Sequence, residues 1–122
     1  MIKELDSDGL KIKFDKKENF RLIDVREKEE FEGGHIVGAT SIPLSSFKEN
    51  YSKFVTDLNE EIVLTCRSGG RSMAAAQFLE KRGFKNLSNH EGGISEWTQE
   101  DYPISENGKV LPSHLRQMPD LS

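Results

Sequence analysis

The sequence has 122 residues but only one cysteine, Cys66. A single cysteine cannot form a disulfide within the chain, which is typical of a reducing compartment, so we expect a cytoplasmic protein. No second cysteine is present to resolve an oxidised or sulfur-bearing Cys66, and an outside partner would have to discharge it. This absence disfavours a redox reductase, although an external thiol could substitute for the missing cysteine.

Long apolar runs are also absent. No segment approaches the roughly 18 apolar residues that a membrane-spanning helix needs, and residues 1–6 lack the apolar core of a signal peptide. The basic residues are scattered, and 17 lysines and arginines against 21 acidic residues give a net charge of −4. We therefore expect neither a membrane nor a nucleic acid as a partner.

Metal-binding patterns are missing as well. The histidines, His35, His90 and His114, have no metal-ligand spacing, and one cysteine does not complete a zinc site. We expect no metal and no cofactor. An acidic chain with a local cationic segment instead suggests a small anionic ligand.

The length suits a single domain. Apolar runs without alternation predict buried strands, and helical spacing of apolar residues predicts helices. The expected strands are 20–25, 39–42, 62–65 and 86–88, and the expected helices are 27–31, 45–54, 72–82 and 94–99. This alternation predicts an α/β domain with a mainly parallel sheet, which binds ligands at the carboxyl ends of its strands.

The composition changes after Pro103, where the apolar periodicity is lost and glycine, proline, serine and asparagine become common. We expect a domain over residues 1–103 and a C-terminal extension over 104–122 that is not a separate domain. From residue 105 the extension is predicted to be an extended tail with one helical turn around 114–117. The sequence does not decide whether this tail packs on the domain.

Cys66 lies between the predicted strand 62–65 and the predicted helix 72–82. Backbone N–H groups converge at such a junction, and the helix dipole favours negative charge there. Arg67 and Arg71 flank the thiol, and each of these features lowers the pKa of a thiol. A lone cysteine is often a buried apolar residue without chemistry, but the polar, cationic segment after Cys66 favours a reactive thiolate.

Four short blocks follow one another between roughly residues 18 and 100. They are Leu-Ile-Asp-Val-Arg at 22–26, Gly-His-Ile-Val-Gly-Ala at 34–39 with Ile42-Pro43 behind it, Cys-Arg-Ser-Gly-Gly-Arg-Ser at 66–72, and Gly-Gly-Ile at 92–94 with Trp97. One block alone would be weak, but four in register resemble the single-domain rhodaneses, which are thiosulfate or persulfide sulfurtransferases. The resemblance implies a rhodanese-like three-layer domain with a mainly parallel central sheet flanked by helices.

The resemblance also implies a catalytic role for Cys66. Its thiolate would take a sulfur from a small anionic donor such as thiosulfate, or from a protein persulfide, and pass it to a thiol or to cyanide. Backbone N–H groups, hydroxyls and guanidinium groups of the loop would hold the sulfur and the donor. The substrate-binding residues expected are Arg67, Ser68, Gly69, Gly70, Arg71 and Ser72. The expected oligomeric state is a monomer or a homodimer.

Loop length separates two chemistries among the proteins that this chain resembles. Six residues from cysteine to arginine go with sulfur transfer in those proteins, and one residue more goes with phosphate or arsenate chemistry. Cys66 to Arg71 spans six residues, which favours a sulfurtransferase. The alternatives are a rhodanese-like binding or regulatory module and, less favoured, a cysteine phosphatase or arsenate-type enzyme.

Most residues outside the loop are expected to have structural roles and no part in the chemistry. Asp24, Arg26 and His35 are expected to support the site, with an acid or base role for Asp24 as the less favoured alternative. His90 could lie at the pocket rim and titrate near neutral pH, or it could be solvated. Residues 29 and 30, both glutamates, are interpreted as part of a solvated face.

Overall fold

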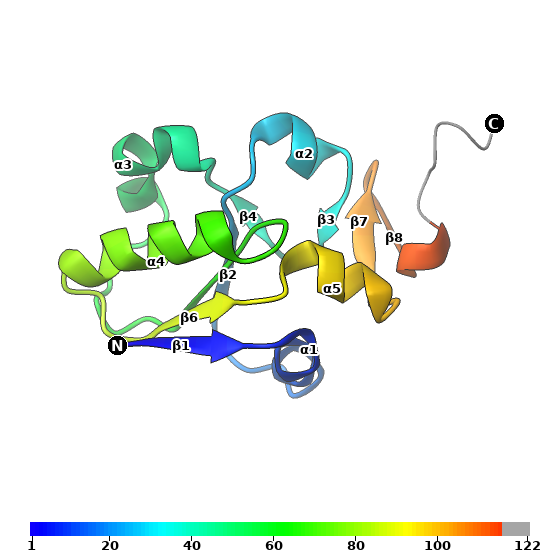
Figure 1. The fold of residues 1–122 in the computed structure, drawn as a ribbon, viewed down its shortest axis with the longest axis horizontal. Coiled ribbons are helices and arrows are strands. Elements are labelled where there is room, and N and C mark those ends of the chain that lie inside the picture. The colour runs from blue at the N-terminus through cyan, green and yellow to red at the C-terminus, as the bar shows by residue number, and fades with distance from the viewer. Residues whose placement is uncertain (116–122) are drawn as a thin grey trace.

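A parallel sheet forms the centre of the domain. The computed structural model describes residues 1–115. Five strands lie in the order β1-β6-β5-β2-β4, all parallel to their neighbours (Figure 1). Their bounds are β1 Ile2–Leu5, β2 Arg21–Asp24, β4 Thr40–Ser41, β5 Ile62–Thr65 and β6 Leu87–His90. The mainly parallel sheet predicted from the sequence is therefore confirmed, and Cys66 directly follows its middle strand.

Helices cover both faces of this sheet (Figure 1). They are α1 Ser7–Asp15, α2 Lys28–Glu32, α3 Phe47–Asn50, α4 Gly70–Lys81 and α5 Gly93–Gln99. Single 3₁₀ turns occupy Leu44–Ser46, Tyr51–Lys53 and Ser113–Leu115, so the helix expected over 45–54 is broken into short turns. On the α4 face, Leu79 joins a core cluster with Ile23, and on the α1 and α5 face, Trp97 joins one with Leu22. The domain has the three layers that the family resemblance implies.

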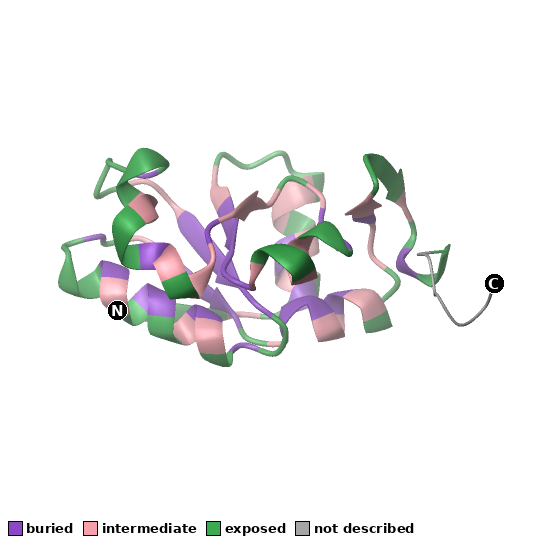
Figure 2. Ribbon diagram, turned by 90° about the horizontal axis from the view of Figure 1, so that it is seen from above, coloured by how far each residue is buried: buried purple, intermediate pink, exposed green. Residues whose placement is uncertain are grey.

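The middle strand is apolar throughout because helices cover it on both sides. In β5, Ile62 and Leu64 belong to the core cluster beneath α4, and Val63 belongs to the cluster beneath α1 and α5. All three side chains are fully buried, and Figure 2 shows the central strands as the buried layer of the molecule. This burial on two faces explains why the segment lacks alternation.

The first strand and the first helix were not predicted from the sequence. β1 pairs with β6 at the edge of the sheet, where Ile2 lies opposite Leu87. The Asp6 carboxylate caps α1 by accepting a hydrogen bond from the Gly9 N–H at 2.7 Å. Among the apolar residues of α1 only Leu10 is fully buried, which leaves a weak helical pattern in the sequence.

Residues 104–111 form a hairpin, which corrects the extended tail expected from residue 105. β7 (Ile104–Glu106) pairs with β8 (Lys109–Leu111), and β7 also pairs with β3 (His35–Ile36). The turn residues Asn107 and Gly108 have φ of 52° and 78°. Asn-Gly is a strong hairpin signal because both residues tolerate positive φ. Of the helical turn expected around 114–117, the structure has a 3₁₀ turn that ends at Leu115, and residues 116 and 117 lie outside the described residues.

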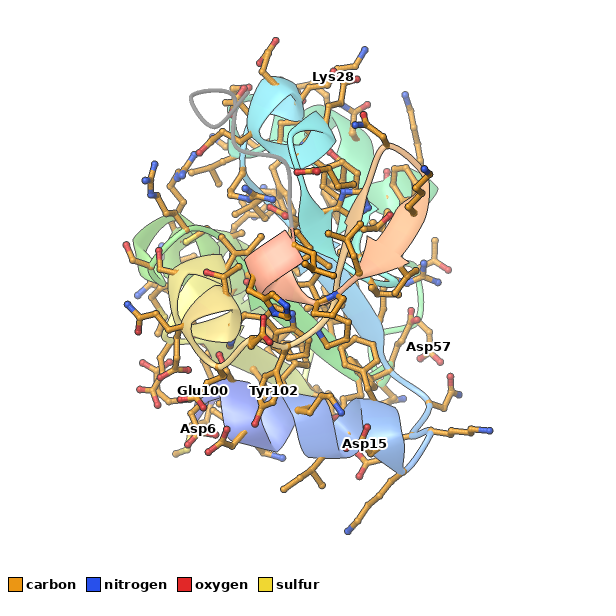
Figure 3. The ribbon with its side chains drawn as sticks, turned by 90° about the vertical axis from the view of Figure 1, so that its right-hand side faces the viewer. Asp6, Asp15, Lys28, Asp57, Glu100 and Tyr102 are labelled. Carbon is orange, nitrogen blue, oxygen red and sulfur yellow. The ribbon has the colours of Figure 1, made fainter. Side chains whose placement is uncertain are left out.

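The hairpin packs against α1 and α5. Ile104 is fully buried in the same core cluster as Trp97, whose indole N–H donates a hydrogen bond to the Pro103 carbonyl at 2.9 Å. Tyr102, which lies beside α1 in Figure 3, donates its hydroxyl to Asp8 at 2.6 Å. The packed part of the chain therefore continues beyond residue 103.

Substituting Ile104 by alanine should lower the free energy of unfolding by about 2–5 kcal/mol, because it leaves a cavity in a filled core. Val110→Ala on β8 is the matched control: Val110 is 66% exposed, and a change within about 0.5 kcal/mol is expected. Urea denaturation followed by circular dichroism measures both. Equal effects of the two substitutions would contradict the packing described for the hairpin.

Candidate active site

The Cys66 sulfur lies inside a ring of hydrogen-bond donors at the end of β5. Sγ accepts a hydrogen bond from the Gly69 N–H at 3.1 Å, and the Ser72 hydroxyl oxygen lies 3.3 Å from it, within reach to donate a second. The side chain is only 1% exposed, and it forms no disulfide. The loop therefore surrounds the sulfur with groups that favour a negative charge on it.

These donors determine the acidity of the thiol. Burial raises the pKa of Cys66, but hydrogen bonds from the Ser72 hydroxyl and from the N–H groups of Ser72, Ser68 and Gly69 outweigh it and lower the pKa below its usual value. The sequence suggested that neighbouring arginines would contribute, and a charge interaction with Arg71 is present. The hydrogen bonds of the loop are nevertheless the largest stabilising contributions.

The start of α5 orients the backbone of the loop. The N–H groups of Ile94 and Ser95 donate to the carbonyls of Cys66 and Arg67 at 2.9 and 3.0 Å. Gly93 makes this close contact possible: its φ is +59°, and a Cβ at this position would lie 2.3 Å from the Arg67 carbonyl oxygen. The Cys66 and Arg67 carbonyls thus point toward α5. The Gly69 N–H that follows them in the chain points toward the sulfur.

The two glycines of the loop differ in what they require. Gly69 has a φ of +99°, and a Cβ on it would lie 2.3 Å from the Glu91 carbonyl oxygen. Gly70 begins α4, and a Cβ there would have no atom within 4 Å. Only Gly69 is needed for its lack of a side chain.

Arg71 is paired with a carboxylate that the sequence interpretation assigned to a solvated face. Its guanidinium donates to both Glu30 oxygens, at 2.7 and 3.1 Å. The hydrogen bond from Arg71 holds the pKa of Glu30 at about 2. Glu30 also accepts a hydrogen bond from the Glu27 N–H at 2.9 Å, so α2 is tied to the loop. By contrast, Arg67 is exposed, and its guanidinium makes no hydrogen bond or ion pair within residues 1–115.

His90 lies inside the protein, which corrects its expected place at the pocket rim. Its ring is fully buried, with Nε2 at 2.7 Å from the Ser7 hydroxyl and Nδ1 at 2.8 Å from the Thr65 hydroxyl. Burial lowers the pKa of His90 to about 4, although the charges of Glu96 and Asp6 oppose this. A neutral His90 therefore links α1 to β5, and it does not titrate near neutral pH.

Asp24 and Arg26 form a buried ion pair, and His35 makes separate contacts with the end of α2. The Arg26 guanidinium donates to Asp24 at 2.8 Å and to the Gly34 carbonyl at 2.9 Å, and both side chains are buried. His35 donates from Nδ1 to the Phe31 carbonyl at 2.9 Å, and its ring stacks on Phe31. The supporting role expected for the three residues stays a prediction.

A cleft of about 290 Å³ lies beside the loop. It is lined by Arg26, Glu29, Glu30, Gly33, Gly34, Arg67, Ile94, Ser95 and Thr98. Among the residues predicted for the site, only Arg26 and Arg67 reach this cleft, and Cys66 is not part of its lining. The cleft is polar and has charges of both signs.

Two kinds of feature are missing from residues 1–115. No group of three His, Cys, Asp or Glu side chains in this part of the chain is arranged to hold a metal ion. None of the helices in the same part has the length and apolar character needed to span a bilayer.

Comparison with known proteins identifies the class. The chain belongs to the rhodanese-like domain family, which matches residues 8–100. Over 104 residues it is 32% identical to a protein named sulfurtransferase from Allochromatium vinosum, a match that covers 85% of this chain and 95% of that protein. Over 77 residues it is 47% identical to the uncharacterized protein YqhL of Bacillus subtilis, covering 63% of this chain and 60% of YqhL. The crystal structure of a rhodanese-like domain protein from Staphylococcus aureus matches with a TM-score of 0.72 and 32% identity, covering 79% of this chain and 91% of that one.

The two loop glycines give the first test of this geometry. Gly69→Ala should lower the free energy of unfolding by about 1–3 kcal/mol, because it combines a strained φ with a collision against backbone. Gly70→Ala should be neutral or slightly stabilising, because alanine is the better helix former. Chemical denaturation of both variants provides the measurement. A Gly70→Ala variant as unstable as Gly69→Ala would contradict the assignment.

Buried His90 gives a second test, through the pH dependence of stability. Its folded pKa of about 4 lies below the ordinary 6.5, so the unfolded chain binds the proton more readily. Protonation of His90 therefore lowers the free energy of unfolding as the pH falls below 6.5. The loss reaches about 3 kcal/mol near pH 4, where it is nearly complete, and it is absent well above pH 6.5. The stability advantage of wild type over His90→Gln, measured by urea denaturation, should therefore shrink between pH 7 and pH 4.5. A constant difference would show that His90 does not stay neutral.

Proposed function

We propose that this domain is a sulfurtransferase in which Cys66 carries the transferred sulfur. The observation that carries the proposal is the position of Sγ, which lies 3.1 Å from the Gly69 N–H and 3.3 Å from the Ser72 hydroxyl, two groups able to donate to it. Such a ring of donors suits a thiolate, and it would equally suit the terminal sulfur of a persulfide anion. The named sulfurtransferase among its relatives supports the same chemistry.

The reaction would proceed in two balanced displacements. The Cys66 thiolate attacks the outer sulfur of thiosulfate, the S–S bond of the donor breaks, and sulfite leaves with the electron pair. A persulfide anion then remains on Cys66. An acceptor thiolate or cyanide attacks the outer sulfur, the bond to Sγ breaks, and the Cys66 thiolate returns. A protein persulfide could replace thiosulfate as the donor, with its thiolate as the leaving group.

The cleft beside the loop would receive the donor. Arg67 lines it and has no partner in the described part of the chain, so its guanidinium is free to bind the anionic end of a donor. Arg71 is already paired with Glu30, and its role would be to hold the loop rather than to bind the anion. A single cysteine without an internal disulfide partner suits a reducing compartment, so we place the reaction in the cytoplasm.

Intact-mass measurement tests the covalent step. The protein is incubated with thiosulfate, freed of excess donor, and compared with Cys66→Ser treated in the same way. Wild type should gain about 32 Da, the mass of one sulfur atom, and lose it on adding cyanide or a thiol. Cys66→Ser should gain nothing.

The same samples separate this proposal from a binding role. Alkylation with iodoacetamide first shows that the Cys66 thiol is free. If that thiol reacts with iodoacetamide but takes no sulfur from thiosulfate or from a persulfide donor, the sulfurtransferase proposal is wrong. A binding or regulatory domain would then be the better account.

A further inference from the structure

The Ser72 hydroxyl has two partners that compete for its proton. Its oxygen lies 3.3 Å from Cys66 Sγ and 2.6 Å from the Asn89 amide oxygen. A serine hydroxyl has one proton and can donate one hydrogen bond. Ser72 is fully buried and Asn89 is 3% exposed, so no solvent replaces the bond that is not made.

The orientation of the Asn89 amide follows from its other neighbours. Its Nδ2 donates to the Glu4 carboxylate at 3.0 Å and to the Gly69 carbonyl at 3.2 Å. Both are acceptors, so the NH₂ group must face them and the amide oxygen must face Ser72. The amide oxygen accepts, which leaves the Ser72 hydroxyl as the donor of the 2.6 Å bond.

Protonation of the sulfur therefore decides which of the two bonds is made. While Cys66 is a thiol, its S–H can donate to the Ser72 oxygen. The Ser72 hydroxyl can then keep donating its own hydrogen bond to the Asn89 amide oxygen. When Cys66 becomes a thiolate, the sulfur needs the Ser72 proton, and Asn89 loses a buried hydrogen bond. Asn89 thus opposes the ionisation that Ser72 favours.

We propose that Asn89 is a positioning residue which acts through Ser72 to control how readily the Cys66 thiol ionises. The proposal rests on the proposed function only in taking the thiolate as the nucleophile. A thiolate that forms too easily is also a weaker nucleophile, because nucleophilicity falls with basicity. Asn89 would keep the pKa of the Cys66 thiol near a value at which enough thiolate is present and that thiolate is still a strong nucleophile. Through Glu4, β1 holds this amide in place.

Replacing Asn89 by leucine adds or removes no charge at the other titratable groups around the loop. They are the ion pairs Asp24–Arg26 and Glu30–Arg71, the free Arg67, the Glu4 carboxylate and neutral His90. A change in thiol ionisation on replacing Asn89 can reach the sulfur through Ser72, through Glu4, or through the Gly69 carbonyl to which Asn89 also donates. The double variant described below separates the Ser72 route from the Gly69 route. Glu4→Gln, which keeps an acceptor but removes the charge, is the matched control.

Ionisation of Cys66 is measured by the ultraviolet absorbance of the thiolate and by the pH dependence of alkylation. In Asn89→Leu the midpoint should move to lower pH, with about fivefold more thiolate at a pH below the midpoint, the factor expected for one hydrogen bond. In Ser72→Ala the midpoint should move to higher pH. Glu4→Gln should leave the midpoint unchanged.

The double variant Ser72→Ala/Asn89→Leu decides the mechanism. It should titrate like Ser72→Ala alone, because Asn89 has no effect without the hydroxyl. An unchanged or higher midpoint in Asn89→Leu overturns the proposal, and so does a double variant in which the Asn89 effect persists. If Asn89→Leu fails to fold, as judged by circular dichroism, Asn89→Asp replaces it. Aspartate keeps the accepting oxygen and adds a negative charge, so the midpoint of Cys66 ionisation should rise. A fall in this midpoint would overturn the proposal. None of these titrations requires sulfur transfer, so failure of the proposed function would leave the result intact.

Discussion

The site depends on the direction in which the loop carbonyls point. The Cys66 and Arg67 carbonyls accept hydrogen bonds from the first N–H groups of α5, and Gly93 permits the close approach. Once these carbonyls are satisfied there, the following N–H groups can turn toward Sγ. The acidity of the thiol thus follows from the packing of a helix against a loop, and it does not require a cation in contact with the sulfur.

The buried polar groups behind the loop are connected to the N-terminal segment. Glu4 on β1 bonds to Asn89, and Ser7 at the start of α1 bonds to His90. On the other side, Glu30 on α2 pairs with Arg71. No buried side-chain nitrogen or oxygen in residues 1–115 lacks a hydrogen bond, so this interior can hold many polar groups without destabilising the fold. The Cys66 loop is therefore held in place by three elements far from it in sequence.

The sequence predicted the parts of the fold that have strong local signals. The buried strand 62–65 and the helix after the loop follow from the apolar patterns on either side of Cys66. β1 and α1 were missed because each buries few apolar side chains, and the β7–β8 hairpin was missed although Asn107-Gly108 signals its turn. The wrong interpretations of Glu30 and His90 have another cause, which is contact with residues far away in the sequence.

Glu30 and His90 show this most clearly. A glutamate on a short helix has no sequence pattern that reveals an arginine 41 positions away, and a histidine two residues before a glycine pair has none that reveals burial against Ser7. The most direct test of the account is an NMR titration of the backbone amides across the ionisation of Cys66. We expect the Gly69, Ser68 and Ser72 amide protons to move downfield together with the thiol midpoint. If the thiol ionises while these amide shifts stay constant, the loop does not stabilise the sulfur in the way described.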